Sequence, residues 1–336
     1  MGKSQKVAKK NEESNSVARA RPEKISRNKR REYLGNAGIT LLPFIGWMIF
    51  SAVPIVLSLI MVFFSMRNSS FEGATFVGFD NFVKLFTQYK TKLGYSILNT
   101  LVYSLKLPIG IIISIWISTM LNKVKNRTMK NTLRTVFFVT YICSISVIII
   151  AFRMIIDEGS GVFNSILNSV GMKGFGWLTS SPWAFHLSAM LIGVWSSIGY
   201  NVVMFQAAMS SIDVSYYESA QIDGASQWTC FWKITMPAIT PTLSFVITTG
   251  LIGCFQAYGE TQVLAMGANG IPEWPNSQYT GPWITCAMWI YNMMFESPAE
   301  YGFGMAATSG WVLAIFIFII IRFNMKLQRK WVCYDF

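Results

Sequence analysis

Charged residues are scarce in this sequence. Only 13% of its 336 residues are Asp, Glu, Lys or Arg, while 52% are hydrophobic, and the mean hydropathy is +0.41. A soluble domain carries about 25% charged residues, so this chain has too little charge for a soluble globule of its length. Its apolar residues gather into blocks long enough for helices that cross a bilayer core of roughly 30 Å. The composition indicates an all-α integral membrane protein with several spans.

Residues for catalysis and metal binding are equally scarce. His186 is the only histidine, and no CxxC or CxH spacing occurs among the five cysteines, Cys143, Cys230, Cys254, Cys286 and Cys333. We therefore expect no His-based catalytic residue, no metal site and no disulfide framework. His186 is expected at the membrane interface, where a helix starts. The sequence has no phosphate-binding GxxxxGK motif either, so we expect no ATPase activity and no cofactor bound by this chain.

Six apolar blocks have the length of membrane spans. They cover about residues 37–65, 94–121, 134–156, 184–210, 241–266 and 304–325. The first block greatly exceeds the roughly 7–15 apolar residues of a signal peptide, so we interpret it as a span. The apolar segment 283–296 is short for a span and fits an interfacial or re-entrant helix. The sequence thus predicts one transmembrane domain over residues 34–326.

Lysine and arginine are unevenly distributed along the chain. Eleven of the 28 lie between Lys3 and Arg31, and further groups lie in the connection 122–133 and after Arg322. The positive-inside rule places these three regions in the cytoplasm, with a disordered basic tail over 1–33 and a second tail over 327–336. We interpret the basic tail as an orientation signal and not as a nucleic-acid site. Both termini are then cytoplasmic, and so is the loop 211–240, despite its acidic excess.

The loop 211–240 has a distinct pattern. Ser215 and Glu218 have the spacing of a capping box, so we predict a helix that starts at Ser215. Ala220 and Gly224 are four residues apart, and their small side chains give that helix a face open to close approach. Gly224 is also expected to end the helix.

The end of the loop is marked by prolines. A second helix is expected from Ala225, and Pro237 is expected to end the loop. Pro241 is expected in the first turn of the next span, where its missing N–H costs nothing.

The same loop matches a family motif. Type I ABC-importer permeases carry Glu-Ala-Ala, three residues, Gly, nine residues, Ile, one residue and Leu-Pro. Here Glu218-Ser219-Ala220 is followed at the same spacings by Gly224, Ile234 and Met236-Pro237, with Ser219 and Met236 as the departures. Further segments resemble the maltose-type, sugar-importing branch, so that the similarity extends over about residues 38–333. They are Asn99-Thr100-Leu101, Arg134-Thr135-Val136-Phe137-Phe138, Trp195 with Gly199-Tyr200-Asn201, and Arg329-Lys330-Trp331.

The resemblance implies a type I importer fold with six transmembrane helices, in the cytoplasmic membrane of a bacterium. It implies that the loop is a coupling helix seated on an ATPase subunit. The docking residues would be Glu218, Ser219, Ala220, Asp223, Gly224, Ile234 and Pro237. Two ATPase subunits that bind ATP and Mg²⁺, a second homologous permease and an extracytoplasmic solute-binding protein would complete the importer. ATP-driven closure would then rock the permease between inward-open and outward-open states and move a sugar, an oligosaccharide in our expectation.

Polar and aromatic residues inside the apolar blocks are candidates for the substrate path. We select Trp195, Tyr200, Asn201, Gln256 and Tyr258, because aromatic faces and amides suit sugars and polar groups in spans tend to face a cavity. Each of them also has a simpler interpretation as a helix-packing residue. Lys106, near the middle of its span, must pair, snorkel or line a cavity, and its partner is not visible in the sequence.

Other functional classes stay open. An importer for amino acids or another solute class would carry the same coupling loop. A secondary transporter would be expected to show intramembrane acids and internal repeats, whereas the apolar blocks are nearly free of carboxylates before Glu260. A membrane enzyme is disfavoured, because no nucleophile–base or metal constellation is present.

Overall fold

The computed structural model describes residues 38–39, 41–67, 72–266, 270–271, 273, 281–296 and 302–333. The tail predicted over 1–33 and the end of the tail predicted over 327–336 lie outside the described residues. The chain divides after Ser58 into two compact units.

Residues 41–58 of the first unit belong to one apolar helix, which ends three residues into the second unit. This helix covers Leu41–Met61 and reaches a mean hydropathy of 2.3 over 18 residues. A π-helical turn, η1 (Met48–Ala52), precedes α3 (Val53–Met61), and the Val53 amide donates to the Met48 carbonyl. The next residue is Pro54, which cannot donate a backbone hydrogen bond and whose ring clashes with the carbonyl four residues earlier. The wider π-turn accommodates this proline inside a continuous helix.

The second unit is built almost entirely from helices. Two short antiparallel strands, β1 (Phe64–Ser65) and β2 (Thr75–Phe76), precede α4 (Asp80–Thr87), α5 (Lys90–Ser104) and α6 (Lys106–Lys123). Next come α7 (Arg127–Ile142), α8 (Ile145–Ile155), α9 (Val162–Ser169) and α10 (Pro182–Ser210). The loop helix α11 (Val214–Ile222) leads to α12 (Gln227–Cys230), η2 (Phe231–Thr235) and α13 (Met236–Phe255). The last elements are α14 (Gly259–Ala265), α15 (Cys286–Tyr291), η3 (Asn292–Glu296) and α16 (Gly302–Gln328).

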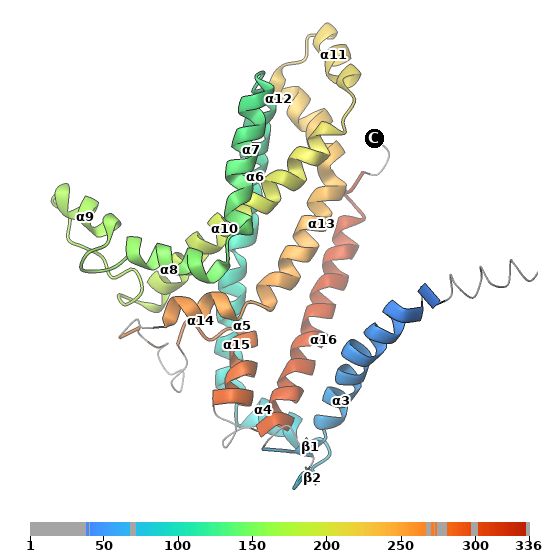
Figure 1. Cartoon of the computed structure of the whole chain (residues 1–336), viewed down its shortest axis with the longest axis vertical. Helices are drawn as coiled ribbons and strands as arrows, with labels where there is room; N and C mark the ends of the chain where they lie inside the picture. Colours follow the sequence, from blue (N-terminus) through green and yellow to red (C-terminus); the bar gives the residue numbers. More distant parts are fainter. Residues whose placement is uncertain are drawn as a thin grey trace, which may run out of the picture. The chain divides into compact units, whose positions relative to one another are not determined.

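Helix α10 is central to the packing of this unit. It lies against α6 and α7 along much of its length and also contacts α13 (Figure 1). Glycines permit the close approach: a Cβ at Gly110 of α6 would come within 2.8 Å of Ser197 Oγ on α10. Likewise, a Cβ at Gly199 of α10 would overlap the Phe137 carbonyl of α7. Small residues at such crossings let helix backbones approach each other inside a membrane.

Buried apolar side chains form three clusters in the second unit. The first joins α5, α8, α10 and α14 around Phe185, and the second joins α6, α10 and α13 around Phe205. The third joins α4, α15, η3 and α16 around Met293. The core is thus distributed along the bundle and holds α5, α6, α10, α13 and α16 each to at least one neighbour.

Five helical segments of the described chain are long and apolar enough to cross a membrane. They cover Leu41–Met61, Lys90–Lys123, Pro182–Ser210, Gln227–Phe255 and Gly302–Gln328. A sixth candidate is the pair α7 and α8, which is bent by 97° at its break. The predicted all-α membrane fold is confirmed, with six spans if the bent pair counts as one.

Two predicted spans differ from the structure. The span predicted over 134–156 is not a straight helix, because Cys143 adopts an extended conformation between α7 and α8. The span predicted over 241–266 ends at Phe255, and the residues beyond it form the separate short helix α14. Hydropathy could not reveal the first break, since apolar residues flank Cys143 and Ser144 on both sides, whereas Gln256 and Glu260 were a polar signal at the second. The segment 283–296 contains only α15 and η3, both short.

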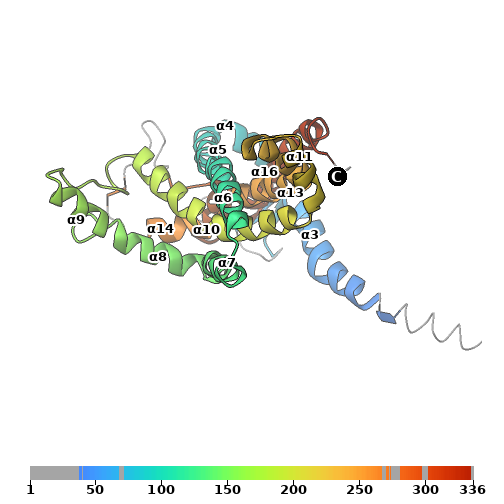
Figure 2. The ribbon, with the colours of Figure 1, turned by 90° about the horizontal axis from the view of Figure 1, so that it is seen from above.

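The two ends of the second unit carry different segments. The α6–α7 connection, α11 and the end of α16 lie at one end, the top of Figure 1, whereas β1, β2 and α4 lie at the other. In Figure 2, α8 and α9 extend to one side of the group formed by α5, α6, α13 and α16. The loop that carries the family motif therefore lies at the end of the bundle toward which α16 runs.

Candidate functional site

The loop helix α11 starts at Val214, with Asp213 as its N-cap. The Asp213 carboxylate accepts a hydrogen bond from the Ser215 amide, with Oδ1 2.9 Å from the nitrogen. The predicted capping box with a helix start at Ser215 is therefore wrong. Both residue types are good N-caps, and the spacing to Glu218 alone favoured the wrong one. The hydrogen bond from the Ser215 amide also holds the pKa of Asp213 below its usual range, because it stabilises the charged form.

Gly224 ends α11 in a left-handed conformation, with φ at 75°. Its amide donates to the Gln221 carbonyl at 3.0 Å, and the Ala225 amide donates to the Ala220 carbonyl at 2.9 Å. This pair of bonds is a Schellman motif, and the prediction that Gly224 ends the helix is confirmed. A Cβ at Gly224 would meet nothing within 4 Å. The backbone conformation is therefore what requires glycine, and the outer side of the turn is open.

The predicted loop 211–240 is shorter in the structure. Ser226 caps a new helix through a hydrogen bond from the Thr229 amide, and this helix continues without a break through Phe255. The connection between spans is thus confined to residues 211–226. Pro241 consequently lies inside α13. The prediction that it lies in the first turn of its span is therefore wrong.

The second half of the motif lies within this long helix. Ile234 belongs to the π-turn η2, and Pro237 follows it. The Met236 amide donates to the Phe231 carbonyl, which repeats the arrangement found before Pro54. Pro237 therefore does not end the loop, because the wider turn absorbs it inside the helix.

The predicted docking residues fall into two groups by exposure. Glu218, Ser219, Asp223 and Gly224 are exposed, whereas Ala220, Ile234 and Pro237 are half-buried. The Tyr217 hydroxyl, which lies 2.8 Å from Thr235 Oγ1, connects α11 to the following helix. Behind α11, toward the α6–α7 connection, is a cavity of about 610 Å³ lined by Tyr217, Lys123 and Lys130, among others. The exposed side of α11 therefore combines acidic and small residues with the large side chains of Val214, Tyr216 and Ile222, and the opposite side borders the cavity.

A second cavity, of about 600 Å³, lies among α6, α10 and α13, beside the bend between α7 and α8. Tyr200 and Asn201, two of the predicted substrate-path residues, line it. The rings of Tyr141 and Tyr200 pack against each other with their centroids 5.2 Å apart. The other polar lining residues are Thr140, Ser196, Ser197, Thr249, Lys106 and Glu260.

The other three predicted substrate-path residues do not line this cavity. Trp195 is half exposed and packs edge-on against Phe152. Gln256 is exposed at the C-cap of α13, and the Tyr258 ring lies 4.5 Å from that of Tyr291. The prediction for Gln256 and Tyr258 relied on a span that continued to residue 266, whereas the helix ends at Phe255.

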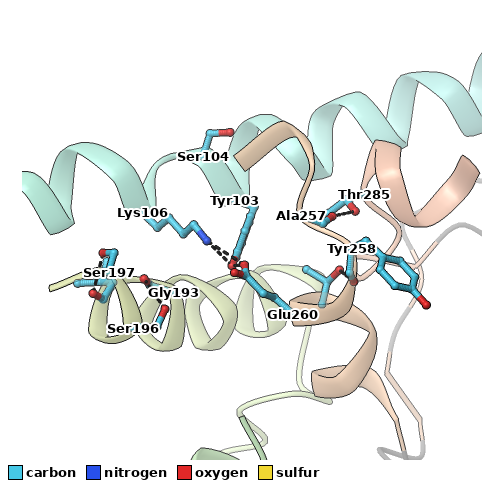
Figure 3. Close-up of polar contacts among 12 residues, drawn as sticks. Tyr103, Ser104, Lys106, Gly193, Ser196, Ser197, Ala257, Tyr258, Glu260 and Thr285 are labelled. Atoms are coloured by element: carbon cyan, nitrogen blue, oxygen red, sulfur yellow. Dashed lines mark hydrogen bonds and ion pairs between the residues drawn. The ribbon is translucent and has the colours of Figure 1, made fainter. Parts of the chain in front are cut away.

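Lys106 finds its partner in Glu260 of α14 (Figure 3). Lys106 Nζ lies 2.9 Å from Glu260 Oε2 and 2.5 Å from the Tyr103 hydroxyl. The Tyr103 hydroxyl in turn donates to the same carboxylate oxygen. The Lys106 side chain is 13% exposed and that of Glu260 is 31% exposed. Sequence reasoning placed both charges in apolar blocks and missed that they pair. Two opposite charges in otherwise apolar blocks were the available signal.

His186 lies near the start of α10, as expected, and is buried in the protein. Its Nε2 lies 3.2 Å from Asn99 Oδ1, and Asn99 Nδ2 donates to the carbonyls of Gly281 and Ile284, both at 3.0 Å. The Asn99-Thr100 segment thus serves to hold α10 and the residues before α15 against α5.

These features define a class of protein: a multi-spanning membrane protein with a polar cavity among its spans and an exposed helix at one end of the bundle. Residues 106–331 match the family of binding-protein-dependent transport system inner membrane components, and the chain belongs to this family. The family predicted from the loop motif is therefore confirmed.

Similar proteins cover nearly the whole chain. The lactose transport system permease protein LacF of Rhizobium radiobacter is 29% identical over 90% of this chain and 97% of its own length. The arabinooligosaccharides transport system permease protein AraP of Bacillus subtilis is 26% identical over 85% of this chain and 86% of its own. A crystal structure of a bacterial ABC transporter involved in the import of alginate contains a similar chain, with a TM-score of 0.75 and 24% sequence identity. The match covers 92% of this chain and 99% of that one. That likeness confirms the predicted importer fold.

Proposed function

We propose that this chain is the permease subunit of an importer for sugars, most of all oligosaccharides, and that it works by alternating access. The observation that carries the proposal is the similarity to LacF, because it covers 97% of that sugar permease. The cavity supports it: hydroxyl and amide groups and the paired rings of Tyr141 and Tyr200 line it. Aromatic faces can stack on the C–H faces of a sugar while polar groups bind its hydroxyls.

The energy for transport would come from separate subunits. In this proposal α11 docks on an ATPase subunit, with Glu218, Ser219, Asp223 and Gly224 at the contact and Ala220, Ile234 and Pro237 supporting them. The exposed acidic and small residues at the end of the bundle favour this assignment. Two ATPase subunits that bind ATP and Mg²⁺, a second permease and an extracytoplasmic binding protein complete the importer. The permease itself is non-catalytic.

Docking is tested by a matched pair of glycine substitutions. Gly224 and Gly171 both have positive φ, at 75° and 79°, and a Cβ at either would meet nothing within 4 Å. Replacing either by Val costs about the same backbone strain, roughly 1–2 kcal/mol. We expect Gly224→Val to lower co-purification of the ATPase subunits by at least about tenfold and Gly171→Val to leave it unchanged. Normal ATPase association and uptake with Gly224→Val would refute the docking role.

The solute class is tested by uptake. Cells that carry the complete importer are compared with cells in which only this chain is deleted, using radiolabelled oligosaccharides and radiolabelled amino acids. We expect deletion to abolish uptake of an oligosaccharide and to leave amino-acid uptake intact. Loss of amino-acid uptake alone would contradict the proposal.

A further inference from the structure

The cavity among α6, α10 and α13 contains an ion pair. Among the described residues that line it, Lys106 and Glu260 are the two with charged side chains. They come from segments 154 residues apart and meet at 2.9 Å (Figure 3). A paired ammonium and carboxylate add no net charge to the cavity, yet they place its strongest hydrogen-bonding groups on the wall.

The surrounding structure is shaped to hold this pair. A Cβ at Gly193 of α10 would come 2.5 Å from Lys106 Cδ and 3.1 Å from the Tyr103 hydroxyl, so the absence of a side chain at Gly193 makes room for the lysine. Tyr103 bridges the pair, since its hydroxyl accepts from Lys106 and donates to Glu260. Four helices, α5, α6, α10 and α14, thus contribute to the position of one charge pair.

Stability does not explain such an arrangement. The cost of removing two charges from water usually matches or exceeds their mutual attraction, and apolar replacements of similar volume are often neutral or stabilising. Ionisable residues inside membrane proteins instead tend to mark the paths of transported solutes. The position of Lys106 and Glu260 on a cavity wall fits that pattern.

We propose that the Lys106–Glu260 pair makes this cavity selective for uncharged, hydroxyl-rich solutes and excludes solutes that carry a carboxylate or an ammonium group. A solute carboxylate bound at Lys106 would add a second negative charge beside Glu260 with one ammonium to neutralise both, and a solute ammonium would likewise add a second positive charge beside Lys106. An unpaired charge in a partly buried site is costly, and specificity is often achieved by such penalties against the wrong ligand.

Neutral hydroxyls meet no such penalty. The Lys106 ammonium has three donors, of which Tyr103 and Glu260 receive two. Both hydrogen bonds to Glu260 from the described residues use Oε2, so Oε1 is the acceptor for a solute hydroxyl. A sugar diol can therefore add hydrogen bonds to both charged groups without separating them. Hydrogen bonds to charged groups are about twice as strong as those between neutral groups.

This inference rests on the proposed sugar transport, and its test separates the two. Cys143 is exposed and lines the cavity, whereas Cys333 is exposed and is not among the lining residues, so it serves as an internal reference. In native membranes that contain the complete importer, alkylation of both thiols is followed by mass spectrometry. The probes are neutral disaccharides of glucose and of galactose, each paired with the disaccharide of the corresponding uronic acid.

We expect a neutral disaccharide to slow the alkylation of Cys143 and not that of Cys333. The concentration of the neutral disaccharide that halves the rate should be at least about tenfold lower than the concentration of its uronic acid counterpart that does so. Glu260→Gln leaves Lys106 without its carboxylate and keeps the shape of the side chain. It should shift the preference toward the uronic acid by about tenfold. The doubly neutral Lys106→Gln/Glu260→Gln chain should lose most of the preference for the neutral sugar, because neither charge of the pair remains. Ser196→Ala removes a hydroxyl from the same wall and should weaken the protection of Cys143 by both probes equally.

The outcomes are distinct. An unchanged ratio in Glu260→Gln, or equal protection by both probes in the unsubstituted chain, overturns the charge-selectivity inference while sugar binding stands. No protection by any disaccharide overturns both the inference and the assignment of this cavity to sugars.

Discussion

Lys106 and Glu260 are interdependent, so removing one has a different cost from removing both. Lys106→Met leaves the Glu260 carboxylate without its ammonium, which costs roughly 3–5 kcal/mol for a fully buried pair. Because the Glu260 side chain is 31% exposed, solvent screening reduces this cost. We expect Lys106→Met to lower the free energy of unfolding by about 2 kcal/mol. Lys106→Met/Glu260→Leu should recover most of the loss. Thermal unfolding of the purified chain in detergent measures the stability of these variants. If the loss of stability in the double variant equals the sum of the losses in the two single variants, the coupling is contradicted.

At the same scale, the residues that the sequence identified best are those whose role is local. Gly224 was placed correctly at a helix end, since its requirement comes from the backbone of its own turn. Tyr200 and Asn201, two of the predicted substrate-path residues, line the cavity, whereas Trp195 does not. The pairing of Lys106 with Glu260 depends on how distant segments pack, and no single sequence contains that information.

At the scale of elements, proline positions explain several features that hydropathy did not. Pro54 and Pro237 both follow a π-turn in which the amide of the preceding residue donates five residues back. The predicted boundary at Pro237 assumed that proline ends a helix. The structure absorbs it in a wider turn instead, so the span begins at Gln227 and the loop shrinks. Helix type and approximate position were predictable, but boundaries and the 97° bend depend on tertiary packing.

The N-cap of α11 predicts a pH-dependent helix. The pKa of Asp213 is lowered in the folded chain by the Ser215 amide. A carboxyl with a lowered pKa stabilises the folded helix above its unfolded pKa of about 3.9, and this contribution disappears as the pH falls through the folded pKa. Hydrogen exchange over residues 214–222 should therefore speed up relative to intrinsic rates as the pH is lowered through that range.

Two variants test this assignment of the cap. Asp213→Ala should speed exchange in α11 several-fold at neutral pH, while Asp213→Asn should retain the cap and lose its pH dependence. Ser215→Ala should have the smaller effect, because it removes the hydrogen bond from the Ser215 side chain to Asp213 and keeps the one from the Ser215 amide. Equal effects of Ser215→Ala and Asp213→Ala would restore the capping box that the sequence suggested.

At the scale of the whole molecule, two basic segments and α11 lie toward the same end of the second unit. The α6–α7 connection carries Lys123, Lys125 and Arg127, and α16 ends near Lys326 and Arg329. The structure places both at the same end of the second unit as α11 (Figure 1). If this end is cytoplasmic, the basic residues follow the positive-inside rule, and the acidic α11 is on the side where ATPase subunits would be.

The orientation is testable by labelling from one side of the membrane. In a chain whose other cysteines are replaced, Cys333 reports on the end of α16 and Lys173→Cys reports on the segment between α9 and α10. We expect an impermeant maleimide to label Lys173→Cys in cells with an intact cytoplasmic membrane, and to label Cys333 after that membrane is permeabilised. Both positions react in detergent, which controls for buried thiols. Labelling of Cys333 in intact cells would invert the topology and remove α11 from the reach of any cytoplasmic ATPase.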